Sequence, residues 1–223
     1  RQTIRKEIPF ALLASLAFLI LASDTRLNSA GQSLLDRSDG LILLLLFAVF
    51  LYYIYEAARN SRENEDGQYP RPDPRALGRY VAFTIGGMLG IIFGGDLVVD
   101  SSVRIAYRLG MSETLVGLTI VAFGTSLPEL ITSVTAGLRK KSDIALGNII
   151  GSNIFNIFFV LGAASVISPL KVDARVFTDS VVMIAATLIL LIFSGTGKKV
   201  GRREGITLTA AYILYLVFIL IRN

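Results

Sequence analysis

The sequence predicts an all-α polytopic membrane protein with seven transmembrane helices. Hydrophobic residues make up 53% of the 223-residue chain, and the mean hydropathy is +0.63. Several apolar runs are long enough to cross about 30 Å of hydrocarbon at about 1.5 Å per residue. Lysines and arginines also alternate between successive connections, as a membrane topology requires. Together these observations exclude a soluble domain.

Seven apolar segments account for the predicted spans, and the first is short for a transmembrane helix. They are residues 8–23, 40–58, 80–102, 113–138, 143–167, 177–194 and 205–221. Residues 59–79 form the long polar connection and contain Pro70 and Pro74, so we expect a mobile cytoplasmic loop there. This loop separates two front helices, within residues 1–58, from a five-helix back part, residues 80–223.

The basic residues predict the orientation. Most of the 22 lysines and arginines fall in four stretches on one side of the membrane, residues 1–6, 59–79, 139–141 and 198–203. Because positive residues are retained on the cytoplasmic side, we expect the chain to begin in the cytoplasm and to end outside. The net charge of +5 follows from this orientation. No basic stripe interleaved with aromatic residues indicates nucleic acid as a partner.

The composition narrows the chemistry further. The chain has no cysteine and no histidine, which excludes disulfides, thiolate metal sites and imidazole ligands. No enzyme motif and no cofactor motif is present, so we expect a protein that is not an enzyme. The first residue is Arg1 rather than methionine, and no signal-peptide layout precedes the first apolar run. We therefore expect the chain to be a piece of a longer protein.

Glu129 is the most informative residue, because it lies in an otherwise apolar span with Thr125, Ser126 and Pro128. An ionisable residue at bilayer depth costs about 2.5–3.5 kcal/mol on insertion scales and marks an ion or proton path. Pro128 has no N–H, so the Gly124 carbonyl loses its helical partner and must face protein or water. The carboxylate, hydroxyl and carbonyl oxygens suit calcium or sodium rather than zinc. The alternative is a proline kink whose glutamate pairs with a neighbouring helix.

The next span carries a second set of polar residues. Asn148, Ser152 and Asn156 recur at four-residue spacing, which places them on one helix face. Gly147 and Gly151 form a small-residue pair that allows another helix to approach closely. For Ser152 and Asn156 we expect ion ligation, since the span with Glu129 directly precedes them. For Asn148 and the glycines, interhelical packing and function remain open alternatives.

These two stretches resemble a known family. Residues 124–129, Gly-Thr-Ser-Leu-Pro-Glu, followed by residues 147–156, Gly-Asn-Ile-Ile-Gly-Ser-Asn-Ile-Phe-Asn, are similar to the α-repeat of the cation/calcium antiporter superfamily. The Thr-Ser-Leu-Pro-Glu form resembles the sodium/calcium exchanger branch, notably its prokaryotic members. Such proteins have ten helices in two inverted halves with one α-repeat in each. This chain has one α-repeat, residues 113–167, so its helices resemble the fourth to the tenth.

The resemblance also implies an ion site. It implies ligation by Glu129, Thr125, Ser126, Ser152 and Asn156, with the Ala122 carbonyl as a sodium ligand; Gly124 and Asn148 complete the candidate set. Family members carry Asp or Asn at the position of Asn156, so Glu129 is the one acid that this repeat supplies. Calcium takes 6–8 oxygens and usually more than one carboxylate. The chain should therefore hold half of a transport site, with a partner acid in the first repeat.

We accordingly expect a secondary antiporter that exchanges cytoplasmic calcium for external sodium by alternating access, in a prokaryotic plasma membrane. Its partners would be calcium and sodium ions, the lipid bilayer, and either the missing N-terminal half or a second copy of the chain. One alternative is a calcium/proton antiporter of the same superfamily, although Thr-Ser stands where that branch has an Asn-rich motif. The other is a non-transporting half-transporter fragment.

Overall fold

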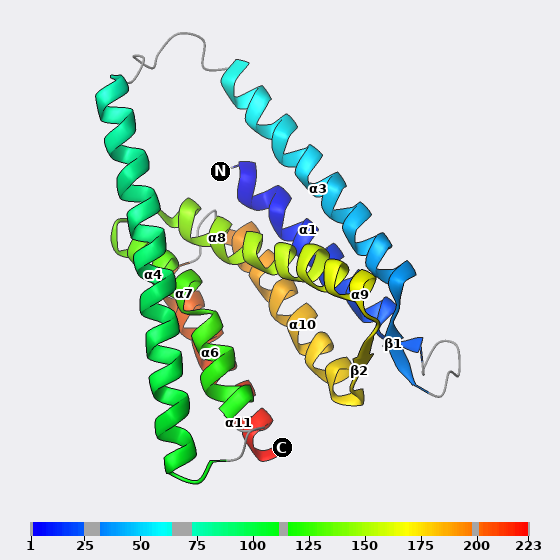
Figure 1. Cartoon of the computed structure of the whole chain (residues 1–223). Helices are drawn as coiled ribbons and strands as arrows, with labels where there is room; N and C mark the ends of the chain where they lie inside the picture. The colour runs from blue at the N-terminus through cyan, green and yellow to red at the C-terminus, as the bar shows by residue number, and fades with distance from the viewer. Residues whose placement is uncertain (1, 25–31, 64–72, 112–115, 198–200, 223) are drawn as a thin grey trace. The chain divides into compact units, whose positions relative to one another are not determined.

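The computed structural model describes residues 2–24, 32–63, 73–111, 116–197 and 201–222, and the described chain is almost entirely helical (Figure 1). The chain divides into two compact units. Unit 1 comprises Arg1–Asn64 and Ser142–Leu208, and unit 2 comprises Glu65–Lys141 and Thr209–Asn223. The centre of the expected mobile loop, residues 64–72, lies outside the described residues.

Long apolar helices confirm the prediction of an all-α polytopic membrane protein. Within the described residues, five helices are long and apolar enough to cross a membrane, and a bent pair adds a sixth candidate. The five are Arg37–Asn60, Arg75–Arg108, Ser142–Ile167, Arg175–Gly195 and Arg202–Arg222, and the bent pair is Thr119–Thr125 with Leu127–Leu138. The first predicted segment corresponds to a shorter apolar helix, Glu7–Leu21, in keeping with its short apolar run.

Two helices extend into the connection that the sequence placed at residues 59–79. Helix α3 spans Arg37–Glu63 and α4 spans Pro74–Arg108. The start of α4 has a local cause, because the Asp73 carboxylate accepts the Arg75 N–H at 3.1 Å and Pro74 follows it at the first helical position. An aspartate N-cap followed by proline is a strong helix start.

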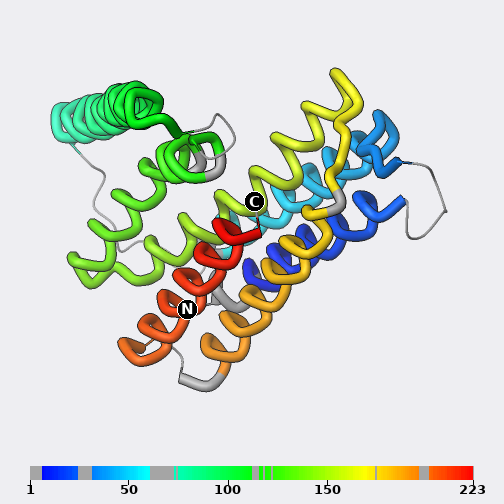
Figure 2. The backbone as a smooth tube through the Cα atoms, turned by 90° about the horizontal axis from the view of Figure 1, so that it is seen from below, coloured from blue at the N-terminus to red at the C-terminus, as the bar shows by residue number. Residues whose placement is uncertain are grey.

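Unit 1 is built from α1 (Gln2–Leu21), α3, α8 (Ser142–Ile154), α9 (Gly162–Ile167) and α10 (Ala174–Gly197). A π-helical segment, η2 (Phe155–Leu161), joins α8 to α9. In Figures 1 and 2, α1 lies beside α8 and α10, and α3 lies beside α9. The helix α11 (Arg202–Arg222) begins in this unit and continues into unit 2.

A short sheet in unit 1 departs from the all-helical expectation. The strands β1 (Ser33–Leu35) and β2 (Leu170–Val172) pair antiparallel, with Leu34 opposite Lys171. Each strand is three residues long, too short to leave a pattern that a sequence reading could detect. This strand pair joins the segment before the N-terminus of α3 to the segment between α9 and α10.

The core of unit 1 forms where α1, α3 and α8–η2 meet. Ile8, Leu43, Ile154 and Phe158 are completely buried there. Helix α1 contributes small side chains, among them Ala14, which is also completely buried. Aliphatic and aromatic side chains on one side and small ones on the other allow close helix packing without large voids.

The contact between α3 and α9 depends on two glycines. A Cβ on Gly40 would lie 2.6 Å from Ser165 Oγ and 2.7 Å from the Gly162 carbonyl oxygen. A Cβ on Gly162 would lie 3.1 Å from the Leu43 Cβ. The two backbones therefore approach too closely for any side chain, as small residues permit between membrane helices.

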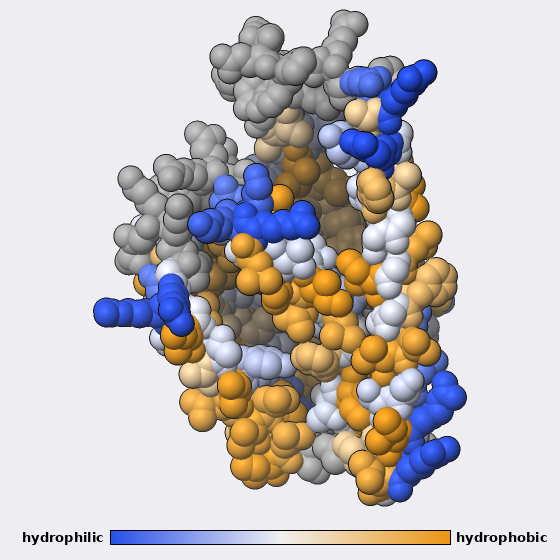
Figure 3. All heavy atoms as spheres, turned by 90° about the vertical axis from the view of Figure 1, so that its left-hand side faces the viewer, coloured by the Kyte–Doolittle hydropathy of each residue, from blue (hydrophilic) through white to orange (hydrophobic). Residues whose placement is uncertain are grey.

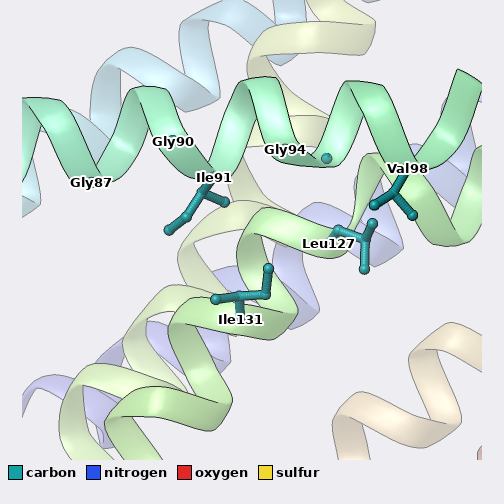
Figure 4. A pocket seen from close by; sticks show the side chains of 8 residues that line it. Gly87, Gly90, Ile91, Gly94, Val98, Leu127 and Ile131 are labelled. Carbon is teal, nitrogen blue, oxygen red and sulfur yellow. The ribbon is translucent and has the colours of Figure 1, made fainter.

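Unit 2 contains the 35-residue helix α4 and a second span that is broken. The broken span consists of the π-helical segment η1 (Gly117–Val121), α6 (Ala122–Thr125) and α7 (Leu127–Leu138). Between α4 and α7 lies an apolar groove of about 450 Å³. Figure 4 shows glycines of α4 facing α7 across it. The groove is lined by Gly87, Gly90, Ile91, Gly94, Gly95, Val98, Leu127 and Ile131.

Beside this groove, α4 touches α6 at one tight point. A Cβ on Gly124 would overlap Val99 Cγ2 and would lie 3.2 Å from the Val99 Cβ. Gly124 is itself buried. Helix α4 is thus pressed against α6 at Val99, while the glycines of the groove leave space between α4 and α7.

Apolar side chains cover much of the surface, as expected of helices that face lipid. Large hydrophobic residues are exposed along α4, including Phe83 at 71%, Phe93 at 68% and Leu97 at 67%. Figure 3 shows hydrophobic residues spread over one face, with hydrophilic residues gathered in separate clusters. In water such a surface would aggregate, but in a bilayer it matches the hydrocarbon.

Replacement of Gly40 by alanine should lower stability by about 1–3 kcal/mol, because the added methyl group would press on the Gly162 carbonyl and overpack the α3–α9 contact. The measurement is the thermal unfolding midpoint of the purified protein in detergent. The matched control is Gly195→Ala in α10, where a Cβ meets no atom within 4 Å. Equal midpoints for the two variants would contradict this account of the contact.

Replacement of Gly124 by alanine should also destabilise the protein, and Val99→Ala should relieve the defect by removing both Val99 γ-methyl groups. We expect a coupling of about 0.5–3 kcal/mol in a double-mutant cycle read from unfolding midpoints. Val98→Ala serves as the control, because Val98 lines the groove and should not rescue Gly124→Ala. Additive effects of the Gly124 and Val99 substitutions would disprove the contact.

Candidate functional site

The predicted break in the span that carries Glu129 is present. Helices α6 and α7 meet at Ser126 with a bend of 53°. Proline at position 128 cannot donate a backbone hydrogen bond. The Ser126 N–H, which would serve Ala122 in a regular helix, instead donates to the Phe123 carbonyl at 3.2 Å. The chain therefore leaves α-helical geometry over the residues that the sequence singled out.

The break supplies carbonyl oxygens. Ala122 and Gly124 lie in the last turn of the first half-helix, α6. In a regular helix the Gly124 carbonyl would accept from residue 128, but Pro128 has no N–H, and the Ser126 N–H is directed at the Gly124 and Phe123 carbonyls. Backbone carbonyls at the C-terminal end of a half-helix are suitable ligands for a cation.

The Glu129 carboxylate lies in the first turn of α7. Ser126 and Glu129 have the Ser-x-x-Glu spacing of a capping box, which would give both residues a purely structural role. The Ser126 side chain nevertheless makes no capping hydrogen bond. Glu129 is half-buried, and its Oε2 atom is shielded from the surface. A helix N-terminus favours a carboxylate in this position.

Two hydroxyl groups complete this first set of oxygens. Thr125 and Ser126 flank the bend, and both are exposed in the structure. Glu129 is the acid of this set. Within the described residues, no group of three or more His, Cys, Asp or Glu could hold a metal ion. A cation at the break would therefore rely on carbonyl and hydroxyl oxygens together with one carboxylate.

The second set of predicted residues lies on α8 and η2, in unit 1. Asn148 and Ser152 are half-buried on α8, and the Ser152 Oγ donates to the Ile149 carbonyl at 3.1 Å. Asn156 is exposed within η2. The prediction that Asn156 shares one helix face with Asn148 and Ser152 stays a prediction.

Two π-helical segments were missed by the sequence reading. Segment η1 leads directly into α6, and η2 contains Asn156. Such segments are rare and occur frequently at functional sites, because they release backbone groups from the regular hydrogen-bond ladder. No composition signal marks them in advance, but η1 directly precedes the first candidate set and η2 contains Asn156 of the second.

The structure thus gathers the predicted residues into two groups. Ala122, Gly124, Thr125, Ser126 and Glu129 lie around the α6–α7 break in unit 2, and Asn148, Ser152 and Asn156 lie on α8 and η2 in unit 1. Their joining in one ion site remains a prediction, as does each residue's role as a ligand.

Comparison with known proteins gives a consistent assignment. Residues 79–221 match the family model described as sodium/calcium exchanger protein. The chain is 36% identical over 225 residues to the inner membrane protein YrbG of Escherichia coli (strain K12), covering 97% of this chain and 66% of that protein. It is 46% identical over 128 residues to the sodium/calcium exchanger MaX1 of Methanosarcina acetivorans, covering 57% of this chain and 37% of that protein.

A solved structure shows the same fold. The sodium-calcium exchanger NCX_Mj, soaked with zero Na⁺ and Ca²⁺, matches with a TM-score of 0.76 at 29% identity, covering 98% of this chain and 67% of that chain. This chain therefore spans about two thirds of the length of such relatives. The expected resemblance to the cation/calcium antiporter superfamily is confirmed. The motif 124–129 lies inside the matched region, and the chain belongs to the sodium/calcium exchanger protein family of integral membrane transporters.

Proposed function

We propose that this protein is a secondary antiporter that exchanges calcium for sodium by alternating access. The observation that carries the proposal is the broken apolar span, in which Glu129 begins one half-helix and the Ala122 and Gly124 carbonyls end the other. Half-helices that meet at the membrane interior are the usual ion sites of secondary transporters. A helix-breaking proline is tolerated at that depth where the backbone around it lines such a cavity.

The chemistry of the oxygens supports exchange between these two ions. Calcium prefers several oxygen ligands at flexible geometry, and sodium binds the same hard oxygens with a smaller charge. The break offers one carboxylate, two hydroxyls and two carbonyls, which are oxygen ligands of the kind that both ions bind. Competition between calcium and sodium for the same oxygens would couple the two fluxes, because a site filled by one ion is closed to the other.

A complete calcium site requires more oxygens than the break offers. Ser152 and Asn156 are proposed to add oxygens from the following span, which has the same polar residues as the family motif. A second carboxylate would come from the first α-repeat, either in the N-terminal half of a longer protein or in a second copy of the chain. The need for a carboxylate from outside this chain agrees with the finding that the chain spans about two thirds of the length of its relatives.

The names of two relatives favour sodium coupling. MaX1 is named a sodium/calcium exchanger, and a mouse relative, 31% identical over 175 residues, is named sodium/potassium/calcium exchanger 2. The Thr-Ser pair at positions 125 and 126 agrees with that branch. We infer a prokaryotic plasma membrane from the bacterial and archaeal relatives. The arginine and lysine distribution predicts that residue 1 lies on the cytoplasmic side.

Replacement of Glu129 by glutamine in the full-length protein should reduce sodium-driven calcium uptake roughly a hundredfold or more, because carboxylate number strongly sets calcium affinity. The assay is calcium uptake into proteoliposomes loaded with sodium. The matched control is Asp143→Asn, since Asp143 is also an acid in the first turn of a helix but is exposed. Unfolding midpoints should be similar. Retained exchange in the Glu129 variant would overturn the site assignment.

The same vesicles test which ion is coupled to calcium, when the sodium gradient is replaced by a proton gradient. We expect an outward sodium gradient to drive calcium uptake and a proton gradient without sodium to give only background uptake. The physical reason is that sodium would occupy the same carboxylate, hydroxyl and carbonyl oxygens as calcium, whereas a proton would bind to one oxygen atom and leave the others available. Uptake driven by protons in the absence of sodium would identify a calcium/proton antiporter instead.

A further inference from the structure

A second acidic residue lies inside the protein, in unit 1 and away from the α6–α7 break in the sequence. Glu7 of α1 is 8% exposed, and the next residue, Ile8, is completely buried. An acid at such a position is costly and requires a specific reason. The ion site as proposed makes no use of Glu7.

The Glu7 carboxylate rests on the backbone of α8. Its Oε2 atom lies 3.8 Å from the point that a Cβ on Gly147 would occupy. A Cβ there would be in ordinary van der Waals contact with the carboxylate, so the carboxyl group lies against α8 at Gly147. The phenol of Tyr53 on α3 is an ionisable neighbour of Glu7. The Tyr53 ring packs on Phe10 with a centroid separation of 5.0 Å, so Glu7 lies where three helices of unit 1 meet.

Much of the contact between α1 and α8 is apolar. On α8, Gly147 begins a stripe that continues through Gly151 and Ile154 at spacings of four and three residues, which is one helix face, and Phe158 of η2 follows it. Ile154 and Phe158 are completely buried. Opposite this stripe, α1 presents small and aliphatic residues.

A single polar group in an apolar helix seam is best known for fixing the register between the two helices. We propose that Glu7 is a positioning residue for transport: its carboxyl group, seated at Gly147, sets the axial position of α8 against α1. Asn148 and Ser152 lie one residue further round the helix from Gly147 and Gly151. Ser152 is five residues beyond Gly147, about 7.5 Å along the axis, so a change in register at Gly147 moves it directly.

This inference rests on the proposed function, because it assigns α8 a part in ion binding. It predicts that the shape and hydrogen-bonding capacity of residue 7 matter and that its negative charge does not. In the full-length protein, Glu7→Gln should therefore behave like the parent. Glu7→Met keeps the volume and suits the apolar seam, but it removes the polar group that selects one register.

The first measurement is the calcium concentration for half-maximal uptake. We expect Glu7→Met to raise it roughly tenfold, in the range of changes caused by residues that orient metal ligands, with an unchanged or higher unfolding midpoint. The control is Glu56→Gln, since Glu56 is an exposed acid of α3 in the same unit, and it should have no effect. A purely structural role would instead lower the midpoint and leave the half-maximal concentration unchanged.

The second measurement reads the register without reference to any transported ion. The 223 residues contain no cysteine, so spin labels can be placed on single cysteines at Leu13 of α1 and Ile149 of α8, which are 44% and 42% exposed. The parent and Glu7→Gln should give one narrow distance, and Glu7→Met a shifted or broadened one. If Glu7→Met does not fold, Glu7→Asp, which draws the carboxyl back from Gly147, should broaden the distance.

The outcomes are separable. The positioning role would be overturned if Glu7→Met changed neither the half-maximal calcium concentration nor the spin-label distance. If Glu7→Met does not fold, an unchanged distance in Glu7→Asp would overturn it. A Glu7→Gln variant as impaired as Glu7→Met would overturn it too, because the charge rather than the register would then be required. If the parent protein fails to exchange sodium for calcium, the proposed function fails, while the distances still decide whether Glu7 sets the register.

Discussion

Proline at position 128 lies in a span that hydrocarbon would force into an unbroken helix, since no water is available there to satisfy exposed backbone groups. Its missing N–H ends the regular ladder, and the chain responds with a bend of 53° at Ser126. The carbonyls in the last turn of α6 and the carboxylate in the first turn of α7 then lie next to the bend. The candidate site in unit 2 depends on this one defect.

Glycine determines how closely the neighbouring helices approach. Gly124 admits Val99 of α4 against the break, while further glycines of α4 leave an open groove beside α7. In unit 1, Gly40 and Gly162 bring α3 and α9 into backbone contact. Because lipid gives no hydrophobic drive for helix association, such close packing supplies much of the attraction. The same residue type thus creates both firm contacts and free space around the polar segments.

The two candidate sets share a design, although they belong to different units. Each lies on a span in which regular α-helix is interrupted, by η1 and the break in one case and by η2 in the other. Interruptions expose oxygens that an intact helix would hide. The chain belongs to the sodium/calcium exchanger protein family. In the proposed antiport, the oxygens of both sets bind the transported ions.

The sequence by itself determined the fold class, the break before Glu129 and the family, because hydropathy, a proline and a contiguous motif are all local signals. It also predicted Asn148, Ser152 and Asn156 as one polar face. It missed η1, η2 and the β1–β2 pair, and it overextended the loop at residues 59–79, since the ends of α3 and α4 depend on caps and neighbours. Only the tertiary structure placed Glu7 on Gly147 and Val99 on Gly124. Those contacts join residues more than twenty positions apart, and chain spacing carries no record of which helix faces meet.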